Sequence, residues 1–233
     1  TLTMSVPATD LDINGIFDLY GTLVATEGQI SFTGNVEQYV DAAGNTVEFN
    51  DLLIDNTHPL GFTFYQSEYI LNGTLYPNQG DIIIENVPGN SFIVNSISAT
   101  EGGRIAAISP SSTITGDVVV RRFIQPGVAD WRDISSPITN GTVLTLDNQM
   151  SISGEGFPDG CAYGTGGCFY SVRKYVNNQY VNVTSVTAPL VSGSGYQVFF
   201  GDDLTTFSGI TLDYRGTILD NSDHQIAIGS GWN

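Results

Sequence analysis

The stretches Leu19-Tyr-Gly-Thr-Leu-Val-Ala-Thr-Glu-Gly-Gln-Ile-Ser-Phe32 and Leu71-Asn-Gly-Thr-Leu-Tyr-Pro-Asn-Gln-Gly-Asp-Ile-Ile-Ile84 decide the fold that we predict for the first part of this chain. They align without a gap, because each position of the second follows its counterpart by 52 residues. Six aligned positions are identical, at Leu19, Gly21, Thr22, Leu23, Gly28 and Ile30 of the first stretch. Short strands that end at glycines and repeat at a fixed offset are typical of a solenoid. We therefore expect the two stretches to share inward columns, with Leu19, Leu23, Ile30 and Phe32 matched to Leu71, Leu75, Ile82 and Ile84.

The offset also predicts the length of one turn. A β-helix turn takes roughly 20–30 residues, so 52 residues correspond to about two turns. The segment Val47–Thr57 would then belong to the turn between the two stretches. Roughly three to four turns fit in residues 1–88, and we predict a β-solenoid-like domain over residues 1–90. The alternative is a small β-sandwich with two similar hairpins.

The rest of the chain, residues 91–233, has the pattern of an antiparallel β-sandwich-like domain. Eight or so short apolar runs follow one another with turns every 8–12 residues, as in sandwiches. Val118–Ile124 and Trp131–Ile138 resemble a hairpin with Arg121 and Arg122 at its centre. Further strands are expected at residues 142–146, 169–175, 179–183, 196–200, 209–215 and 225–228. The predicted fold class is therefore all-β, a short solenoid followed by a sandwich.

Charge is distributed unevenly along the chain, whose net charge is −17. Residues 1–103 contain thirteen Asp and Glu and no Lys or Arg, and all seven basic residues lie from Arg104 onward. Nucleic acid and anionic membrane surfaces are disfavoured as partners, because both need clustered Lys and Arg. The sequence has no run of about 18 apolar residues, so no membrane-spanning segment is predicted. Acidic surfaces suit divalent cations or a salty exterior, and solubility alone explains them equally well.

Asp10-Leu-Asp-Ile-Asn-Gly-Ile-Phe-Asp18 has oxygen-bearing side chains at alternating positions, as in the first half of a calcium loop. The closing acid is absent, since Gly21 stands where a bidentate Glu would be. The favoured interpretation is a strand whose acids face outward while Leu11, Ile13 and Ile16 face the core. No cofactor is expected, with calcium as the alternative.

Two pairs of carboxylates, Asp51 with Asp55 and Asp12 with Asp18, are candidates for glycoside hydrolysis. That chemistry needs a defined separation and one raised pKa. Paired surface acids are common in so acidic a chain, so solvated surface acids are the favoured interpretation.

Cys161 and Cys168 are the only cysteines and lie seven residues apart in a glycine-rich loop. A disulfide is the favoured interpretation, and it implies an oxidising exterior. Zinc would need four ligands, and His58 and His224 are distant in sequence. Free thiols are the remaining alternative.

Two further sets of side chains are candidates for binding. One of Arg121 and Arg122 is expected to face inward and pair with an acid such as Asp133 or Asp213, with ligand recognition as the alternative. Aromatic rings that could stack on sugars, although most aromatics of a sandwich lie in its core, are Trp131, Tyr163, Tyr180 and Trp232.

Several segments also resemble a known family in their order along the chain. They are Gly116-Asp-Val118, Arg122-Phe-Ile124, Trp131-Arg132, Ser135-Ser-Pro-Ile138, Gly193-Ser-Gly-Tyr196 and Leu212-Asp-Tyr-Arg-Gly-Thr217. In this order they resemble a pattern of large repetitive surface proteins of Bacteroidetes that are exported by the type IX secretion system. The chain departs from the pattern with Gln125 before its proline and Val128-Ala-Asp130 in the turn. The resemblance implies a place at the cell surface, in a family of attachment and matrix proteins.

No enzyme is predicted, because no Gly-x-Ser-x-Gly elbow, P-loop or dinucleotide fingerprint occurs. We predict a non-enzymatic segment of a large extracellular surface protein, acting as a structural stalk or adhesin in attachment or as a filament component. The alternatives are a glycan- or protein-binding module and a polysaccharide-degrading enzyme on a β-helix. Expected partners are neighbouring modules of a longer parent chain, a surface polysaccharide, host or particle surface, and the type IX machinery during export.

Overall fold

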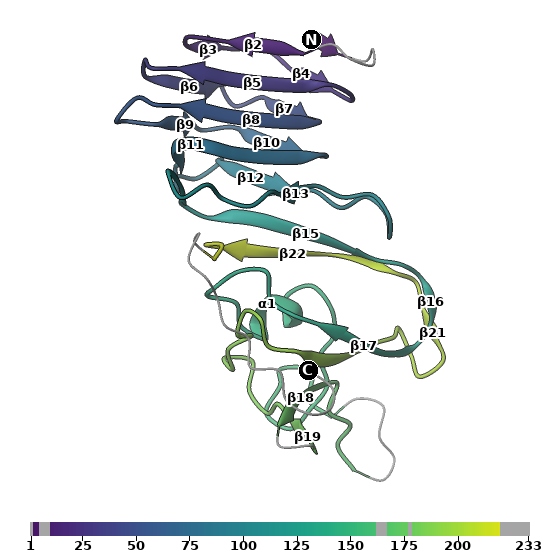
Figure 1. Ribbon diagram of the computed structural model, residues 1–233. Coiled ribbons are helices and arrows are strands. Elements are labelled where there is room, and N and C mark those ends of the chain that lie inside the picture. The colour runs from purple at the N-terminus through teal and green to yellow at the C-terminus, as the bar shows by residue number, and fades with distance from the viewer. Residues whose placement is uncertain (1, 5–9, 162–166, 177–178, 220–233) are drawn as a thin grey trace. The chain divides into compact units, whose positions relative to one another are not determined.

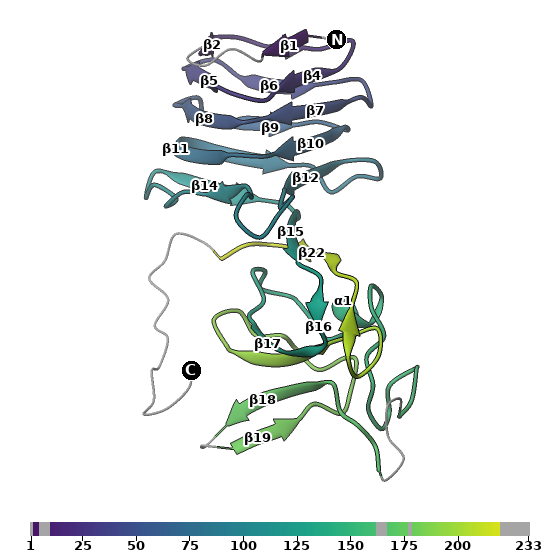
Figure 2. The ribbon, with the colours of Figure 1, turned by 90° about the vertical axis from the view of Figure 1, so that its right-hand side faces the viewer.

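The first unit is a β-solenoid of about five turns, in which strands of successive turns stack in parallel (Figures 1 and 2). The computed structural model describes residues 2–4, 10–161, 167–176 and 179–219. Its two units comprise residues 1–122 with 215–222, and residues 123–214 with 223–233.

Each turn of the solenoid contributes strands to three faces. The first face stacks β1 (Leu2–Met4), β4 (Leu23–Ala25), β7 (Thr46–Phe49), β10 (Glu68–Leu71), β12 (Ser91–Val94) and β15 (Val118–Ile124). The second face stacks β2 (Leu11–Ile13), β5 (Gln29–Gly34), β8 (Asp51–Asn56), β11 (Thr74–Ile84) and β13 (Arg104–Ile105). The third face stacks β3 (Phe17–Asp18), β6 (Gln38–Asp41), β9 (Phe62–Phe64), the end of β11 and β14 (Ser112–Thr115).

The core consists of inward columns of apolar side chains, because residues in a strand alternate between inside and outside. Strand β8, for example, alternates half-buried and buried positions along its whole length. In register on the first face are Leu23, Val47, Tyr69, Phe92 and Val118. The second face aligns Leu11, Ile30, Leu52, Leu75 and Ile105, and the third aligns Phe17, Val40, Phe64 and Ile84. Each fully buried side chain of this size contributes roughly 1.5–3 kcal/mol.

Tyr69 is the one tyrosine that fills an inward position of these columns, and it is fully buried. Its hydroxyl lies 2.9 Å from the carbonyl oxygens of both Val40 and Tyr65. Burial raises the pKa of Tyr69 above its ordinary value, so the hydroxyl remains a donor. The phenol thereby joins the core without leaving a buried polar group unpaired.

The prediction that the two quoted stretches share columns is wrong, although the solenoid itself is confirmed. Leu23 lies on the first face and Leu75 on the second; Ile30 lies on the second face and Ile82 on the third. The motif Leu-x-Gly-Thr-Leu turns a corner in both places, but not the same corner. Two turns take 46 residues from Leu23 to Tyr69, so an offset of 52 moves the motif onward by one face. Both copies still point their apolar residues inward, since the same local sequence suits either corner.

The solenoid continues beyond residue 90, the predicted boundary. Strand β12 pairs with β10, and β13 and β14 pair with β11, so the next turn stacks on the solenoid and the units divide after Arg122. The expected hairpin is also not formed. Val118–Val120 pair in parallel with Phe92–Val94, whereas β17 (Asp130–Ile134) pairs with a strand of the second unit. Strands β15 and β17, which the expected hairpin would have joined, therefore belong to different sheets.

Buried amide side chains close one corner between the second and third faces. Gln38 and Asn56 are both fully buried. Asn56 Nδ2 donates to Gln38 Oε1 at 2.7 Å and to the Val36 carbonyl at 2.9 Å. Gln38 Nε2 donates in turn to the Ile13 carbonyl at 2.8 Å. The two amides thus link three successive turns and satisfy backbone groups that a tight corner leaves unpaired.

Asparagines are aligned in the same way at the corner between the first and second faces. Asn72 Oδ1 accepts a hydrogen bond from Asn95 Nδ2 at 2.8 Å, one turn further on. Arg121 continues this row, and its Nη1 lies 3.5 Å from Asn95 Oδ1, while Arg122 is exposed. A hydrogen bond to an aligned amide is therefore one contact of Arg121, and the pairing of one of the two arginines with an acid stays a prediction.

Two glycines allow the corners to approach each other closely. Gly80 and Gly116 have φ values of 81° and 96°. This backbone conformation is strained for a residue that has a Cβ. A Cβ on Gly80 would meet the Asn56 carbonyl oxygen at 2.0 Å, and one on Gly116 would meet that of Ile84 at 1.9 Å. Both clashes are with the backbone of the preceding turn, so these positions set the spacing between turns.

One corner carries an excursion. Residues 96–103 leave the solenoid after β12 and return before β13, and Gly103 N donates to the Asn95 carbonyl at 2.6 Å. A bridge between Ser96 and Gly102 closes the base of this loop. The chain therefore re-enters the second face beside the point where it left.

The second unit contains two antiparallel sheets. The larger has the order β17, β20 (Tyr196–Phe200), β18 (Val172–Val176) and β19 (Gln179–Asn182). The smaller pairs β16 (Gly127–Val128) with β21 (Thr206–Phe207). Strand β22 (Ile210–Gly216) follows them in sequence. These antiparallel sheets and the solenoid together confirm the predicted fold class.

One predicted strand of the second unit is wrong. Residues 142–146 contain the start of α1 (Leu144–Asp147), a single helical turn whose Leu146 is fully buried. One apolar side chain on a short helical turn reaches the core as well as a strand would, so the apolar pattern could not separate the two. The strand expected at 225–228 lies outside the described residues.

We expect that deletion of residues 47–68 gives a shorter solenoid that still folds. Val47 and Tyr69 are in register, so the deletion removes one turn of 22 residues and places Tyr69 beside Leu23. Deletion of residues 47–57 removes half a turn and sends every later strand to the wrong face. Circular dichroism and thermal unfolding should show a cooperative β-protein for the first deletion alone. Equal behaviour of the two deletions would contradict the register.

The Asn56→Ala variant should lose about 2–3 kcal/mol of unfolding free energy, because it leaves the buried Gln38 oxygen and the Val36 carbonyl without their donor. The control is Thr57→Ala, whose exposed hydroxyl donates to Gly34, with an expected loss below about 0.5 kcal/mol. Urea unfolding measures both. Similar losses for the two variants would remove the role assigned to the amide pair.

Candidate ligand-binding face

The larger sheet of the second unit places one set of side chains on a common side. Opposite residues in antiparallel strands share a side, and the register pairs Trp131 with Phe199, Arg173 with Gln197, and Tyr175 with Tyr180. Because side chains alternate, the other side of this sheet carries buried Val172, Tyr196 and Val198. We call the first side the aromatic face. It carries Trp131, Asp133, Arg173, Tyr175, Tyr180, Asn182, Gln197 and Phe199.

The guanidinium of Arg173 lies at the centre of this face. Its Cζ is 3.7 Å from the centroid of the Trp131 ring and 4.2 Å from that of Tyr180. Its Nε donates to Gln197 Oε1 at 3.0 Å. Contacts between a cation and ring faces at these distances are attractive, and more so where water is partly excluded. Two rings and one hydrogen bond therefore hold the guanidinium in place.

Further rings support the Trp131 end. The centroids of Phe169 and Phe199 lie 5.7 Å from that of Trp131 and 5.1 Å from each other. At the other end Tyr175 lies 5.1 Å from Tyr180, whose side chain is 43% exposed. The face thus runs from a packed aromatic cluster to an accessible tyrosine on an edge strand.

Arg173 retains hydrogen-bonding capacity. A guanidinium has five N–H donors, and Gln197 accepts from one of them. In the part of the chain that the structure describes, Arg173 has no other hydrogen bond and no ion pair. A planar fork of donors beside aromatic rings suits a carboxylate or another oxyanion.

The structure does not bring the predicted carboxylate pairs together. Asp51 and Asp55 lie four residues apart on β8, about 13 Å along a strand, beyond the roughly 5–9.5 Å that glycoside hydrolysis uses. Asp51 Oδ1 accepts from the Thr74 amide at 2.6 Å, which is a structural contact. Asp12 and Asp18 lie on different faces, on β2 and β3.

Two oxygen-bearing side chains of the predicted calcium half-loop contact the next turn. Asp10 Oδ1 accepts from the backbone N–H of Gln29 at 3.1 Å, and Asn14 Oδ1 accepts from Thr33 Oγ1 at 2.8 Å. Ile16 is 55% exposed, in contrast to the expectation, and Phe17 packs against the core in its place. Among the described residues, no group of three His, Cys, Asp or Glu side chains could hold a metal ion. Calcium binding stays untested.

Two carboxylates outside these pairs have shifted pKa values. Hydrogen bonds from Thr205 and Thr206 lower the pKa of Asp203 to about 2, so this side chain is the acceptor that closes a turn. Burial, and then repulsion from Asp159, raise the pKa of Asp147. Ser151 Oγ donates to Asp159 Oδ2 at 2.7 Å, which closes the segment after α1. Both shifts thus have structural causes.

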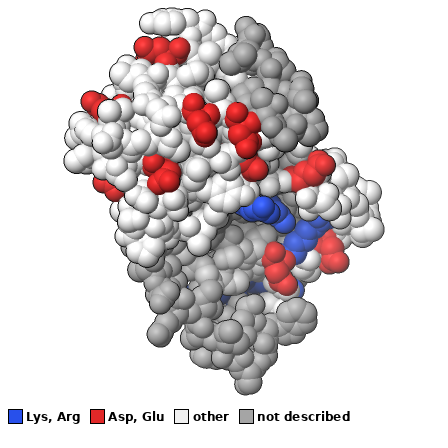
Figure 3. Space-filling model, turned by 45° about the horizontal axis from the view of Figure 1, so that its top comes forward, with Lys and Arg blue, Asp and Glu red and all other residues white. Residues whose placement is uncertain are grey.

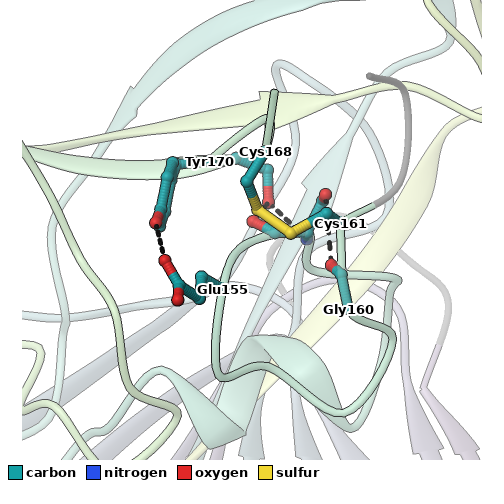
Figure 4. Close-up of a disulfide and its surroundings, with 7 residues drawn as sticks. Glu155, Gly160, Cys161, Cys168 and Tyr170 are labelled. Carbon is teal, nitrogen blue, oxygen red and sulfur yellow. Dashed lines mark hydrogen bonds between the residues drawn. A yellow bond between two sulfur atoms is a disulfide. The ribbon is translucent and has the colours of Figure 1, made fainter. Parts of the chain in front are cut away.

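Cys161 and Cys168 form a disulfide (Figure 4). Tyr170 and Glu155 lie beside it, and the tyrosine hydroxyl donates to Glu155 Oε2 at 3.2 Å. Gly160, next to the first cysteine, accepts from the Gly154 amide at 2.9 Å through its carbonyl. The first cysteine therefore follows directly after a turn that the hydrogen bond between Gly154 and Gly160 closes.

Of the four aromatic candidates from the sequence, the structure places Trp131 and Tyr180 on one face. Tyr163 and Trp232, like His224, lie outside the described residues. Arg173 and Gln197 were missed as candidates. The alternation Phe169, Ser171, Arg173, Tyr175 could have indicated one face of a strand, but not which residues would lie opposite it.

Comparisons with protein-family models, with curated proteins and with solved structures found no match. Within the described part of the chain, no helix is both long and apolar enough to span a membrane.

We expect the disulfide to contribute about 2–3 kcal/mol to the free energy of unfolding, because it closes a short loop in the unfolded chain. Reduction should lower the stability of the native protein by this amount. Adding the same reductant to a Cys161→Ser, Cys168→Ser double variant should change nothing. Urea unfolding gives the stabilities, and intact mass under non-reducing conditions should be two hydrogens below the reduced mass. Two alkylatable thiols in oxidised material would contradict the bond.

Proposed function

We propose that this chain is a non-enzymatic segment of a large extracellular surface protein, in which the solenoid serves as a structural stalk for attachment. The observation that carries this proposal is the continuous stack of about five turns with unbroken inward columns. Each turn buries its open side against its neighbours, so such a stack is a stiff spacer that lengthens by adding turns. Spacing a contact away from a surface is a mechanical task that needs no chemistry.

Charge supports the same role. Figure 3 shows acidic side chains scattered over the solenoid, and residues 1–103 contain no Lys or Arg. Like charge keeps neighbouring copies apart when they approach within the Debye length, about 10 Å at 0.1 M salt. A surface crowded with many copies benefits from this repulsion.

An extracellular location is supported by the disulfide, because such bonds persist in oxidising compartments. The resemblance to type IX-exported surface proteins of Bacteroidetes points to the same place. We propose as partners the neighbouring modules of a longer parent chain, the type IX machinery during export, and a surface polysaccharide or a host or particle surface.

A second candidate function is a glycan- or protein-binding module. The aromatic face supports it, because Trp131, Arg173 and Tyr180 form a half-exposed platform on one side of a sheet. Aromatic rings with a polar partner are common in contacts with sugars and proteins. In this view the second unit makes the contact and the solenoid sets its distance.

The stalk role is tested in cells that carry the protein, by in-frame deletion of the coding region for residues 1–233. Attachment should fall several-fold while the remainder of the protein is still displayed, as measured with an antibody to that remainder. Deletion of residues 47–68 should preserve most attachment, because it shortens the solenoid by one turn and keeps the register. Unchanged attachment after the full deletion would overturn the role. Polysaccharide turnover by the purified protein that is lost in Asp55→Asn would overturn its non-enzymatic character.

A further inference from the structure

We propose that the aromatic face binds the carboxylate groups of an acidic polysaccharide, a polymer that contains uronic acid units, with Arg173 as the carboxylate contact. This inference rests on the second candidate function above and names its ligand class. It is carried by a guanidinium held between two rings, with most of its donors uncommitted among the described residues.

Local charge favours an anionic ligand. The whole chain has a net charge of −17, but the four strands of this sheet contain three basic residues, Arg132, Arg173 and Lys174, and two acidic ones, Asp130 and Asp133. The sheet therefore has a charge of +1. On the aromatic face itself the charged groups are Arg173 and Asp133. Asp133 lies two strands away from Arg173 and is in register with Gln197. The guanidinium is the one cation on this face, so an anion is the complementary partner.

Geometry favours a carboxylate. The rings of Trp131 and Tyr180 lie against the guanidinium at 3.7 and 4.2 Å, and Gln197 holds Nε. The remaining donors are those on the two Nη atoms, which form parallel hydrogen bonds with the two oxygens of a carboxylate. Because the guanidinium is already fixed, little side-chain entropy is lost when the anion binds.

The surroundings favour a sugar as the carrier of that carboxylate. Half-exposed aromatic side chains flank the cation, and Tyr180 is 43% exposed beside it. The apolar C–H groups of a pyranose pack well on aromatic side chains, which present an apolar body and a polar tip. Asn182 and Asp133 lie on the same side at exposed positions and can bond sugar hydroxyls. An open sheet face suits an extended polymer, whereas a small ligand is more often held in a pocket.

The test measures binding of the purified chain to polygalacturonate, with its methyl ester as the neutral polymer of the same backbone. We expect binding to polygalacturonate that weakens with salt, and at least tenfold weaker binding to the ester. Arg173→Gln should weaken binding at least tenfold. The matched control is Lys174→Gln, which removes the same charge from the next residue, on the opposite side of the sheet, and should change binding less than twofold. Thermal unfolding checks that each variant is folded.

Two further variants keep the test decisive if Arg173→Gln is unstable. Arg173→Lys retains the charge but not the fork, and should still lose most of the affinity. Tyr180→Ala removes an accessible ring on an edge strand and should weaken binding several-fold without unfolding the sheet. Wild-type affinity in both folded variants would overturn the proposal.

Other results would also overturn it. The first is absence of binding to polygalacturonate, or equal binding to its methyl ester. The second is an equal loss of affinity in Arg173→Gln and Lys174→Gln. The third is binding to dextran sulfate or polyglutamate that is as tight as binding to polygalacturonate, or tighter. Dextran sulfate would indicate a sulfate site, and polyglutamate an acidic peptide. Failure of this inference is distinct from failure of the stalk role: attachment that needs residues 1–233 but survives Arg173→Gln supports the stalk and removes this site.

Discussion

The register of parallel strands is the constraint on which the solenoid depends. Every turn must return its inward side chain to the same column, and successive members of the first column are separated by 24, 22, 23 and 26 residues. A slip of one residue would turn apolar side chains outward and polar ones inward. The side-chain amides at the corners, such as those of Gln38 and Asn56, also favour this register, because their hydrogen bonds form only when neighbouring turns are aligned. Core and corners therefore specify a single alignment.

The sequence was sufficient to predict a solenoid, because the spacing of apolar residues and corner glycines is a local property. It was not sufficient to place each repeat on a face. Leu19–Leu23 and Leu71–Leu75 turn different corners with nearly the same residues, and only the hydrogen-bonding partner of each strand distinguishes the corners. The extent of the solenoid was underestimated for a related reason. Strands β13 and β14 are short and lack the repeated motif, and they belong to the stack through pairing with β11 alone.

The candidate site could be predicted only in part. Trp131 and Tyr180 stood out individually as rings that are able to stack, but they lie 49 residues apart in sequence. What joins them is Arg173, on a strand that lies between theirs in the sheet. That neighbourhood follows from the strand order β17, β20, β18, β19, which no local pattern specifies. Cys161 and Cys168 were easier to pair, since they are close in sequence and need no knowledge of the topology.

The loop of residues 96–103 has a consequence for how such a molecule can change over time. The two ends of this loop meet at the bridge between Ser96 and Gly102 and at the hydrogen bond from Gly103 to Asn95. The packing of the core therefore does not depend on the residues between them. Natural variation in length can accumulate at this corner without selection against it from the packed columns. New surface features can therefore be acquired as insertions there, and an engineer could graft a recognition loop, a tag or a whole domain at the same position.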